Sequence, residues 1–116
     1  MEINKFKSEL KEISNLGGHP KFYELLLKIA KLHAYKNSDY AGNDDPLSNL
    51  RGSERLGIPA WKGVLVRIGD KFDRINNIAK KGSISVKSES IKDTLEDMAV
   101  YSLLCHILYD ESGTVG

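Results

Sequence analysis

The sequence predicts an all-α fold, a compact bundle of three long helices with shorter ones beside them. Two observations lead to this prediction. Apolar residues recur every three or four positions in several segments, which is the spacing of amphipathic helices. Segments with the alternating pattern of a β-strand are nearly absent. A chain of 116 residues can build one modest core, so we expect a single domain over residues 1–116.

Glycine and proline mark the limits of the first two helices. A first helix is expected over residues 4–16, where apolar residues keep a helical spacing until Gly17-Gly18 interrupts it. Pro20 suits the first turn of a second helix because its fixed φ is already helical. That helix, KFYELLLKIAKLHAYKNSDY, runs out near Gly42.

A short helix and a long one are predicted next. The segment LSNLRGSERLG is expected to form a short helix that ends at Gly57, and Pro59 opens the long helix. Lys80-Lys81-Gly82 closes it, because positive charge and glycine favour a helix C-terminus. Its apolar stripe consists of Trp61, Val64, Leu65, Ile68, Phe72, Ile75 and Ala79.

The last predicted helix, ESIKDTLEDMAVYSLLCHILY, has two unlike halves, and Ser88 is placed to cap it. Its first half is acidic, whereas its second half is apolar on almost every side. We therefore expect both faces of the second half to be covered, either by the bundle or by a second chain. The second possibility predicts a homodimer or a higher homo-oligomer.

Composition excludes several classes of partner. The chain is 41% hydrophobic and 28% charged, with a net charge of +1. That balance gives no general attraction to polyanions, so neither direct nucleic-acid binding nor membrane binding is expected. The single cysteine, Cys105, lies in an apolar run, which suits a reducing compartment and a core position. The charged, amphipathic start of the chain does not resemble a signal peptide, so we expect a cytoplasmic protein.

Carboxylates gather at the start of the last helix. Glu89, Asp93 and Asp97 are four residues apart and therefore line one side, which continues into apolar residues. Acids next to a buried surface need a cation or hydrogen bonds, and oxygen ligands favour Mg²⁺ or Mn²⁺. The alternative is that acids near a helix N-terminus simply complement its dipole. Asp97 lies deeper in the helix, where that explanation fits less well.

Basic residues line the long helix that precedes it. Arg67, Lys71 and Arg74 follow an i, i+4, i+7 spacing, so they share a side that could hold phosphates. Asp70 lies among them and could complete a metal site with the last helix. The alternative is a solvated face with intrahelical ion pairs, such as Asp70 with Arg74.

Four blocks in order resemble the nucleotide-modification-associated domain 1 family, which occurs largely in bacteriophages and prophages. They are KNSDY (36–40), DPLSNLR (45–51), VRIGDKFDRI (66–75) and ESIKDTLEDMAVY (89–101), within a match over about residues 25 to 108. At a more remote level the chain is similar to the all-α nucleotide pyrophosphohydrolases of the MazG type. Their EExxE motif is here R-x-x-D-K-x-x-R, and their ExxD motif is here D-x-x-x-D.

The resemblance implies roles for individual residues. The catalytic and metal-binding residues would be Asp70, Glu89, Asp93 and Asp97, which would hold Mg²⁺. Phosphates would be held by Arg67, Lys71 and Arg74, and the base or sugar would be recognised by Lys36, Asp39, Tyr40, Asn49 and Arg51. Helix ends, turns and core positions are the structural alternatives for the last group. For Trp61 we favour the core.

Two functions follow from the resemblance. The first is a Mg²⁺-dependent (deoxy)nucleoside triphosphate pyrophosphohydrolase that acts on a nucleotide pool. The alternative is a non-catalytic protein that binds and sequesters a nucleotide signal of host immunity, which would make it an anti-defence protein. The reduced number of acids on the long helix favours the alternative, and the acids on the last helix favour the enzyme.

Overall fold

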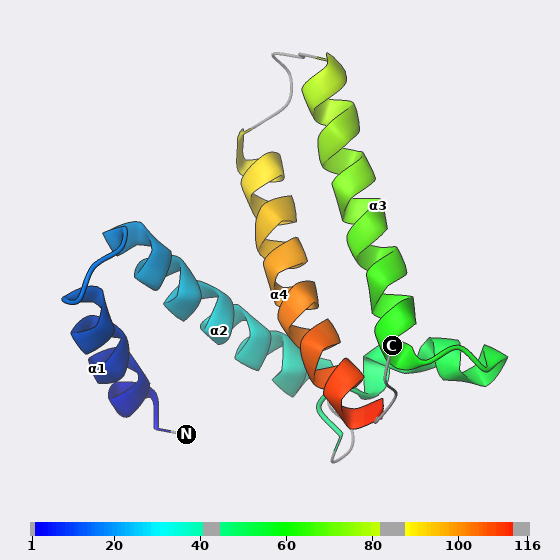
Figure 1. Cartoon of the computed structure of the whole chain (residues 1–116), viewed down its shortest axis with the longest axis horizontal. Helices are drawn as coiled ribbons and strands as arrows, with labels where there is room; N and C mark the ends of the chain where they lie inside the picture. The colour runs from blue at the N-terminus through cyan, green and yellow to red at the C-terminus, as the bar shows by residue number, and fades with distance from the viewer. Residues whose placement is uncertain (1, 41–44, 82–87, 113–116) are drawn as a thin grey trace. The chain divides into compact units, whose positions relative to one another are not determined.

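A computed structural model of the chain describes residues 2–40, 45–81 and 88–112, with the side chains of 37–40 and 88–90 left out. Within these ranges the secondary structure is helical throughout and contains no strand, which confirms the all-α prediction. The chain divides into two compact units, Met1–Tyr40 and Ala41–Gly116. The single domain that the sequence predicts stays a prediction. Figure 1 labels the four α-helices.

The first unit is a hairpin of α1 (Ile3–Ser14) and α2 (Pro20–Tyr40). Gly17 and Gly18 make the turn with φ angles of 145° and 89°, a region that residues with a Cβ rarely adopt. The hydroxyl of Tyr23 donates to the carbonyl of Gly17 at 2.8 Å and fixes the turn against α2. Both helices begin and end within two residues of the predicted limits.

The second unit is built on an antiparallel pair of long helices, α3 (Ala60–Lys81) and α4 (Ser88–Ser112), which lie side by side (Figure 1). Two 3-10 helices precede the pair, η1 (Ser48–Leu50) and η2 (Gly52–Leu56), in place of the single short helix predicted there. Gly57 ends η2 in the left-handed region, with a φ of 76°. The predicted capping role of Ser88 concerns a side chain outside the described residues.

The core of the second unit lies at its η1 end. It consists of Leu47, Leu50, Ala60, Val64 and Leu108. Val64 is fully buried, and Leu108 is 2% exposed, so each contributes about 1.5–3 kcal/mol through burial. Trp61 packs against this core, as predicted, and its ring meets that of Tyr109 edge to face at 5.1 Å. The core therefore fixes η1 against one end of the helix pair.

No helix in the described part of the chain is long and apolar enough to cross a membrane.

Candidate functional site

The contact between α3 and α4 contains a lysine where a helix pair usually places an apolar residue. Val64, Ile68, Lys71 and Ile75 follow the spacing of the side of α3 that faces α4, and all four are buried or half-buried. The ammonium of Lys71 lies 3.2 Å from a carboxylate oxygen of Asp97 on α4. Both side chains keep about a third of their surface, 29% and 37%. The carboxylate of Asp97 therefore offsets the positive charge of Lys71 at the edge of the contact between the two helices.

The salt bridge places the basic row of α3 beside the acidic row of α4. Because the helices are antiparallel, Arg74 and Asp93 both lie about one turn from the salt bridge in the same direction. Arg67 lies about one turn away in the other direction. We call this side of the pair the α3–α4 face, defined by Arg67, Lys71, Arg74, Asp93 and Asp97.

Two members of the α3–α4 face keep their charge available. Arg67 and Asp93 are exposed, and neither forms an ion pair or hydrogen bond with another described residue. Arg67 and Lys71 are one helical turn apart, with about 6 Å between their Cβ atoms. A chain of linked phosphates could therefore contact both cations at once.

Asp70 does not join the acidic row. Successive residues of a helix point about 100° apart, so Asp70 turns away from α4 when Lys71 turns toward it. Asp70 is exposed and has no ion pair with a described residue, so the Asp70–Arg74 pair of the alternative interpretation is not formed either. The side chain of Asp70 therefore lies in solvent.

The four predicted metal ligands are not seen as one group. Among the side chains that the structure describes, those of residues 2–36, 45–81 and 91–112, no three from His, Cys, Asp or Glu are placed to hold a metal ion. The side chain of Glu89 lies outside the described residues. Asp93 and Asp97 share a side of α4, but Asp97 is already paired with Lys71. The predicted Mg²⁺ site, which includes Glu89, therefore stays a prediction.

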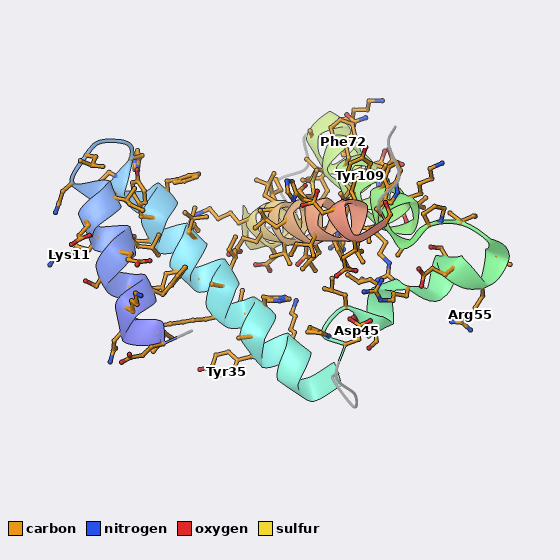
Figure 2. The ribbon with its side chains drawn as sticks, turned by 60° about the horizontal axis from the view of Figure 1, so that its bottom comes forward. Lys11, Tyr35, Asp45, Arg55, Phe72 and Tyr109 are labelled. Carbon is orange, nitrogen blue, oxygen red and sulfur yellow. The ribbon has the colours of Figure 1, made fainter. Side chains whose placement is uncertain are left out.

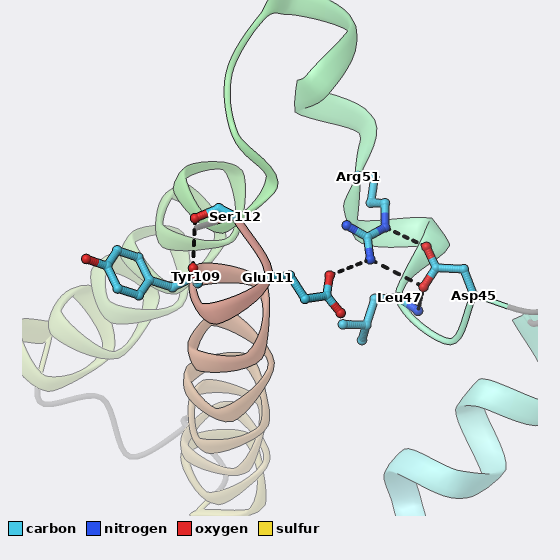
Figure 3. A network of polar contacts seen from close by, with 6 residues as sticks. All are labelled: Asp45, Leu47, Arg51, Tyr109, Glu111 and Ser112. Carbon is cyan, nitrogen blue, oxygen red and sulfur yellow. Dashed lines mark hydrogen bonds and ion pairs between the residues drawn. The ribbon is translucent and has the colours of Figure 1, made fainter. Parts of the chain in front are cut away.

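Arg51, a predicted ligand-binding residue, lies in a separate polar network. Figure 3 shows its guanidinium between two carboxylates. It donates through Nε to Asp45 and through a terminal nitrogen to Glu111 at 2.9 Å. Glu111 belongs to the last turn of α4, where the helix dipole disfavours an anion, and Arg51 supplies the compensating charge. The network ties the segment before η1 to the end of α4.

The electrostatics of this network follow from its geometry. The hydrogen bond from Arg51, followed by the backbone N–H of Leu47, lowers the pKa of Asp45 below its usual value of 3.8. Hydrogen bonds to Asp45 and Glu111 raise the pKa of Arg51 further above its usual value. Neither acid was predicted from the sequence as a partner of Arg51. Their signals were a turn-forming Asp-Pro step and an acid in a final helical turn.

The structure does not bring Arg51 to the α3–α4 face. Glu111, which it contacts, is 14 residues beyond Asp97 on the same helix, about 21 Å along the axis. Asn49 is exposed on η1, at the same end as Arg51. Lys36 is exposed on α2 in the first unit. Asp39 and Tyr40 end α2, and their side chains lie outside the described residues.

Cys105 has the core position that its surroundings predict. Its thiol lies 3.4 Å from the carbonyl oxygen of Trp61, and burial raises the pKa of the thiol. A raised pKa keeps the group protonated and makes it a poor nucleophile at neutral pH.

The chain gives no match to any family model, to any curated protein or to any solved structure with which it was compared.

Proposed function

We propose that the α3–α4 face binds the phosphates of a nucleotide and holds the nucleotide without cleaving it. The observation that carries this proposal is the Lys71–Asp97 salt bridge. It joins a row of three cations to the partner helix and keeps the ammonium of Lys71 at the surface rather than in the core.

Phosphate binding fits the free donors of the face. A guanidinium such as that of Arg67 binds phosphate oxygens through two parallel hydrogen bonds, and an ammonium acts as a point charge. Lys71 forms an ion pair with Asp97, yet its ammonium stays partly exposed and has N–H donors for a phosphate. Asp97 then acts as a positioning residue, because it holds the ammonium beside Arg67.

Sequestration is supported better than hydrolysis by the placement of the acids. Of the four predicted metal ligands, Asp70 is turned away from α4 and Asp97 is already paired with Lys71. A phosphate held by basic side chains requires no metal. The resemblance to phage proteins suggests that the bound nucleotide is a signal of host immunity.

The hydrolase is the second candidate, and one observation favours it. Asp93 is exposed, lacks an ion pair within the described residues and lies one turn from Asp97 on α4. In that case the protein would be a Mg²⁺-dependent pyrophosphohydrolase of (deoxy)nucleoside triphosphates. Bound Mg²⁺ would offset the charge that develops on the phosphates.

One experiment separates the two candidates. Purified protein is incubated with deoxynucleoside triphosphates and with cyclic and ADP-ribose-type nucleotides, with and without Mg²⁺. Chromatography then follows each nucleotide before and after heat denaturation. We expect one nucleotide to leave the solution and to return unchanged on denaturation. A new monophosphate that forms only with Mg²⁺ would establish the hydrolase instead.

Variants assign the result to the face. Arg67→Ala is expected to weaken retention at least about tenfold, because a charge-assisted hydrogen bond contributes about 1.5–3 kcal/mol. Asp97→Asn is expected to weaken it less, since it leaves all three cations in place. Arg55→Ala removes an equal charge from η2 and should have no effect. Figure 2 shows Arg55 on the η2 segment, away from α3 and α4. Equal effects of Arg67→Ala and Arg55→Ala would overturn the proposal.

A further inference from the structure

The side of α4 that faces away from α3 carries exposed apolar residues, interspersed with Glu96 and His106, and has charged residues at its ends. Leu95, Leu103 and Ile107 are 52%, 56% and 45% exposed, and Ala99 is exposed between them. The charged ends are Lys92 and Asp110, both exposed. The sequence predicted that both faces of the second half of this helix are covered. These exposed fractions show that the described residues of the second unit leave much of it open.

These residues form one line along the helix. Lys92, Ala99, Leu103 and Asp110 follow spacings of seven, four and seven residues, which are the spacings of a helix–helix seam. The line extends about 27 Å, five turns of helix. Ala99 is small, so a second helix can approach closely at the centre.

The line is complementary to itself when it is reversed. Lys92 and Asp110 each lie nine residues from Tyr101, and Ala99 and Leu103 each lie two residues from it. Leu95 and Ile107 each lie six residues from it and flank the line. In an antiparallel pair with a two-fold axis at the level of Tyr101 along the helix, the ammonium of Lys92 on each chain therefore meets the carboxylate of Asp110 on the other.

We infer that two copies of this chain associate through their α4 helices, antiparallel and with the two-fold axis at the level of Tyr101 along the helix. The occupant of the apolar side is a second copy because the charge pattern matches its own reverse. At the centre, Leu103 packs beside Ala99 of the partner subunit. At each end, Lys92 pairs with Asp110 of the partner subunit. Within its own chain, Asp110 lies 3.6 Å from His106 and is 70% exposed, so its carboxylate remains accessible.

Charge reversal tests both the association and its register. Lys92→Glu places two like-charged pairs in the dimer, and Asp110→Lys does the same with the opposite sign. Sedimentation velocity is expected to show wild type at twice the 12.9 kDa chain mass and each single variant at the chain mass. An equimolar mixture of the two variants restores both opposite-charge pairs, so the mixture should return to the dimer mass. The double variant Lys92→Glu/Asp110→Lys should do so as well.

Controls and contrary results complete the test. Lys80→Glu and Asp73→Lys reverse exposed charges on α3 and should leave the dimer intact. Leu103→Asp should also reduce the mass to that of one chain, and circular dichroism should show unchanged helix content for every variant. Wild type at the chain mass at every concentration would overturn the inference. So would a dimer that survives both single reversals, or variants that do not re-form it when they are mixed.

Discussion

The guanidinium of Arg51 has two carboxylate partners that come from distant parts of the sequence. Asp45 is six residues before it, and Glu111 is sixty residues after it. Arg51 lies in the block DPLSNLR, one of the four that carry the resemblance, and this predicted a ligand-binding role. Here its donors are largely used within the chain, so its contribution to the structure of the second unit can be measured directly.

Arg51→Met is expected to lower the thermal midpoint by a few degrees at neutral pH, because both carboxylates lose their cation. The effect should depend on pH. Arg51 lowers the pKa of Asp45 below 3.8 in the folded state, so this stabilisation is fully present above about pH 5. It is lost as the pH falls through the lowered pKa. Thermal melts of wild type and Arg51→Met at several pH values would measure the difference.

Arg55→Met is the matched control for this prediction, because Arg55 is exposed and forms no ion pair with a described residue. It should leave the melts unchanged at every pH. A difference between wild type and Arg51→Met that stays constant down to pH 3 would contradict the assigned role of Asp45.

At the scale of the elements, the helices themselves were predictable. Pro20, Gly17 and Gly57 have fixed local preferences, and the apolar spacing of residues 61–79 requires no knowledge of the partner helix. The division of residues 48–56 into two 3-10 helices was not predicted. That backbone depends on the Arg51 network and on packing against α3, and neither is visible in local sequence.

Gly63 and Gly69 of α3 differ in the space that is open to an added Cβ. A Cβ on Gly63 would lie 2.6 Å from the hydroxyl oxygen of Ser53, which donates to the carbonyl of Ile58 at 3.0 Å. A Cβ on Gly69 would meet nothing within 4 Å. Gly69→Ala is therefore expected to stabilise the protein by about 0.5–1 kcal/mol.

Gly63→Ala should instead destabilise it, because the clash displaces Ser53 and breaks its hydrogen bond, in addition to moving η2 off α3. Urea unfolding of the two variants at equal conditions would compare them. If both substitutions stabilised the protein equally, η2 would not pack closely on α3 at Gly63.

At the scale of the whole molecule, the sequence could predict which charges share a side of one helix but not which helices meet there. The Lys71–Asp97 contact depends on the register between α3 and α4, which their packing sets. Asp70 is an example. It is adjacent to Lys71 in the sequence, yet its side chain points away from α4 and so lies apart from the acidic row. The resemblance to known families could suggest which residue types form a site. Which of those residues lie near one another depends on how the helices pack.

Phosphate binding by the α3–α4 face, as proposed, can be measured by NMR with inorganic triphosphate as the probe. The probe carries no base, so the test does not depend on the identity of the nucleotide. Backbone and side-chain signals are followed as triphosphate is added to ¹⁵N-labelled protein, with Arg67→Ala and Arg55→Ala as paired variants.

We predict saturable shifts that concentrate on residues 67–74 of α3 and 93–97 of α4, lost in Arg67→Ala and retained in Arg55→Ala. Shifts of similar size at exposed lysines and arginines throughout the chain, or shifts that do not saturate, would contradict phosphate binding at the α3–α4 face.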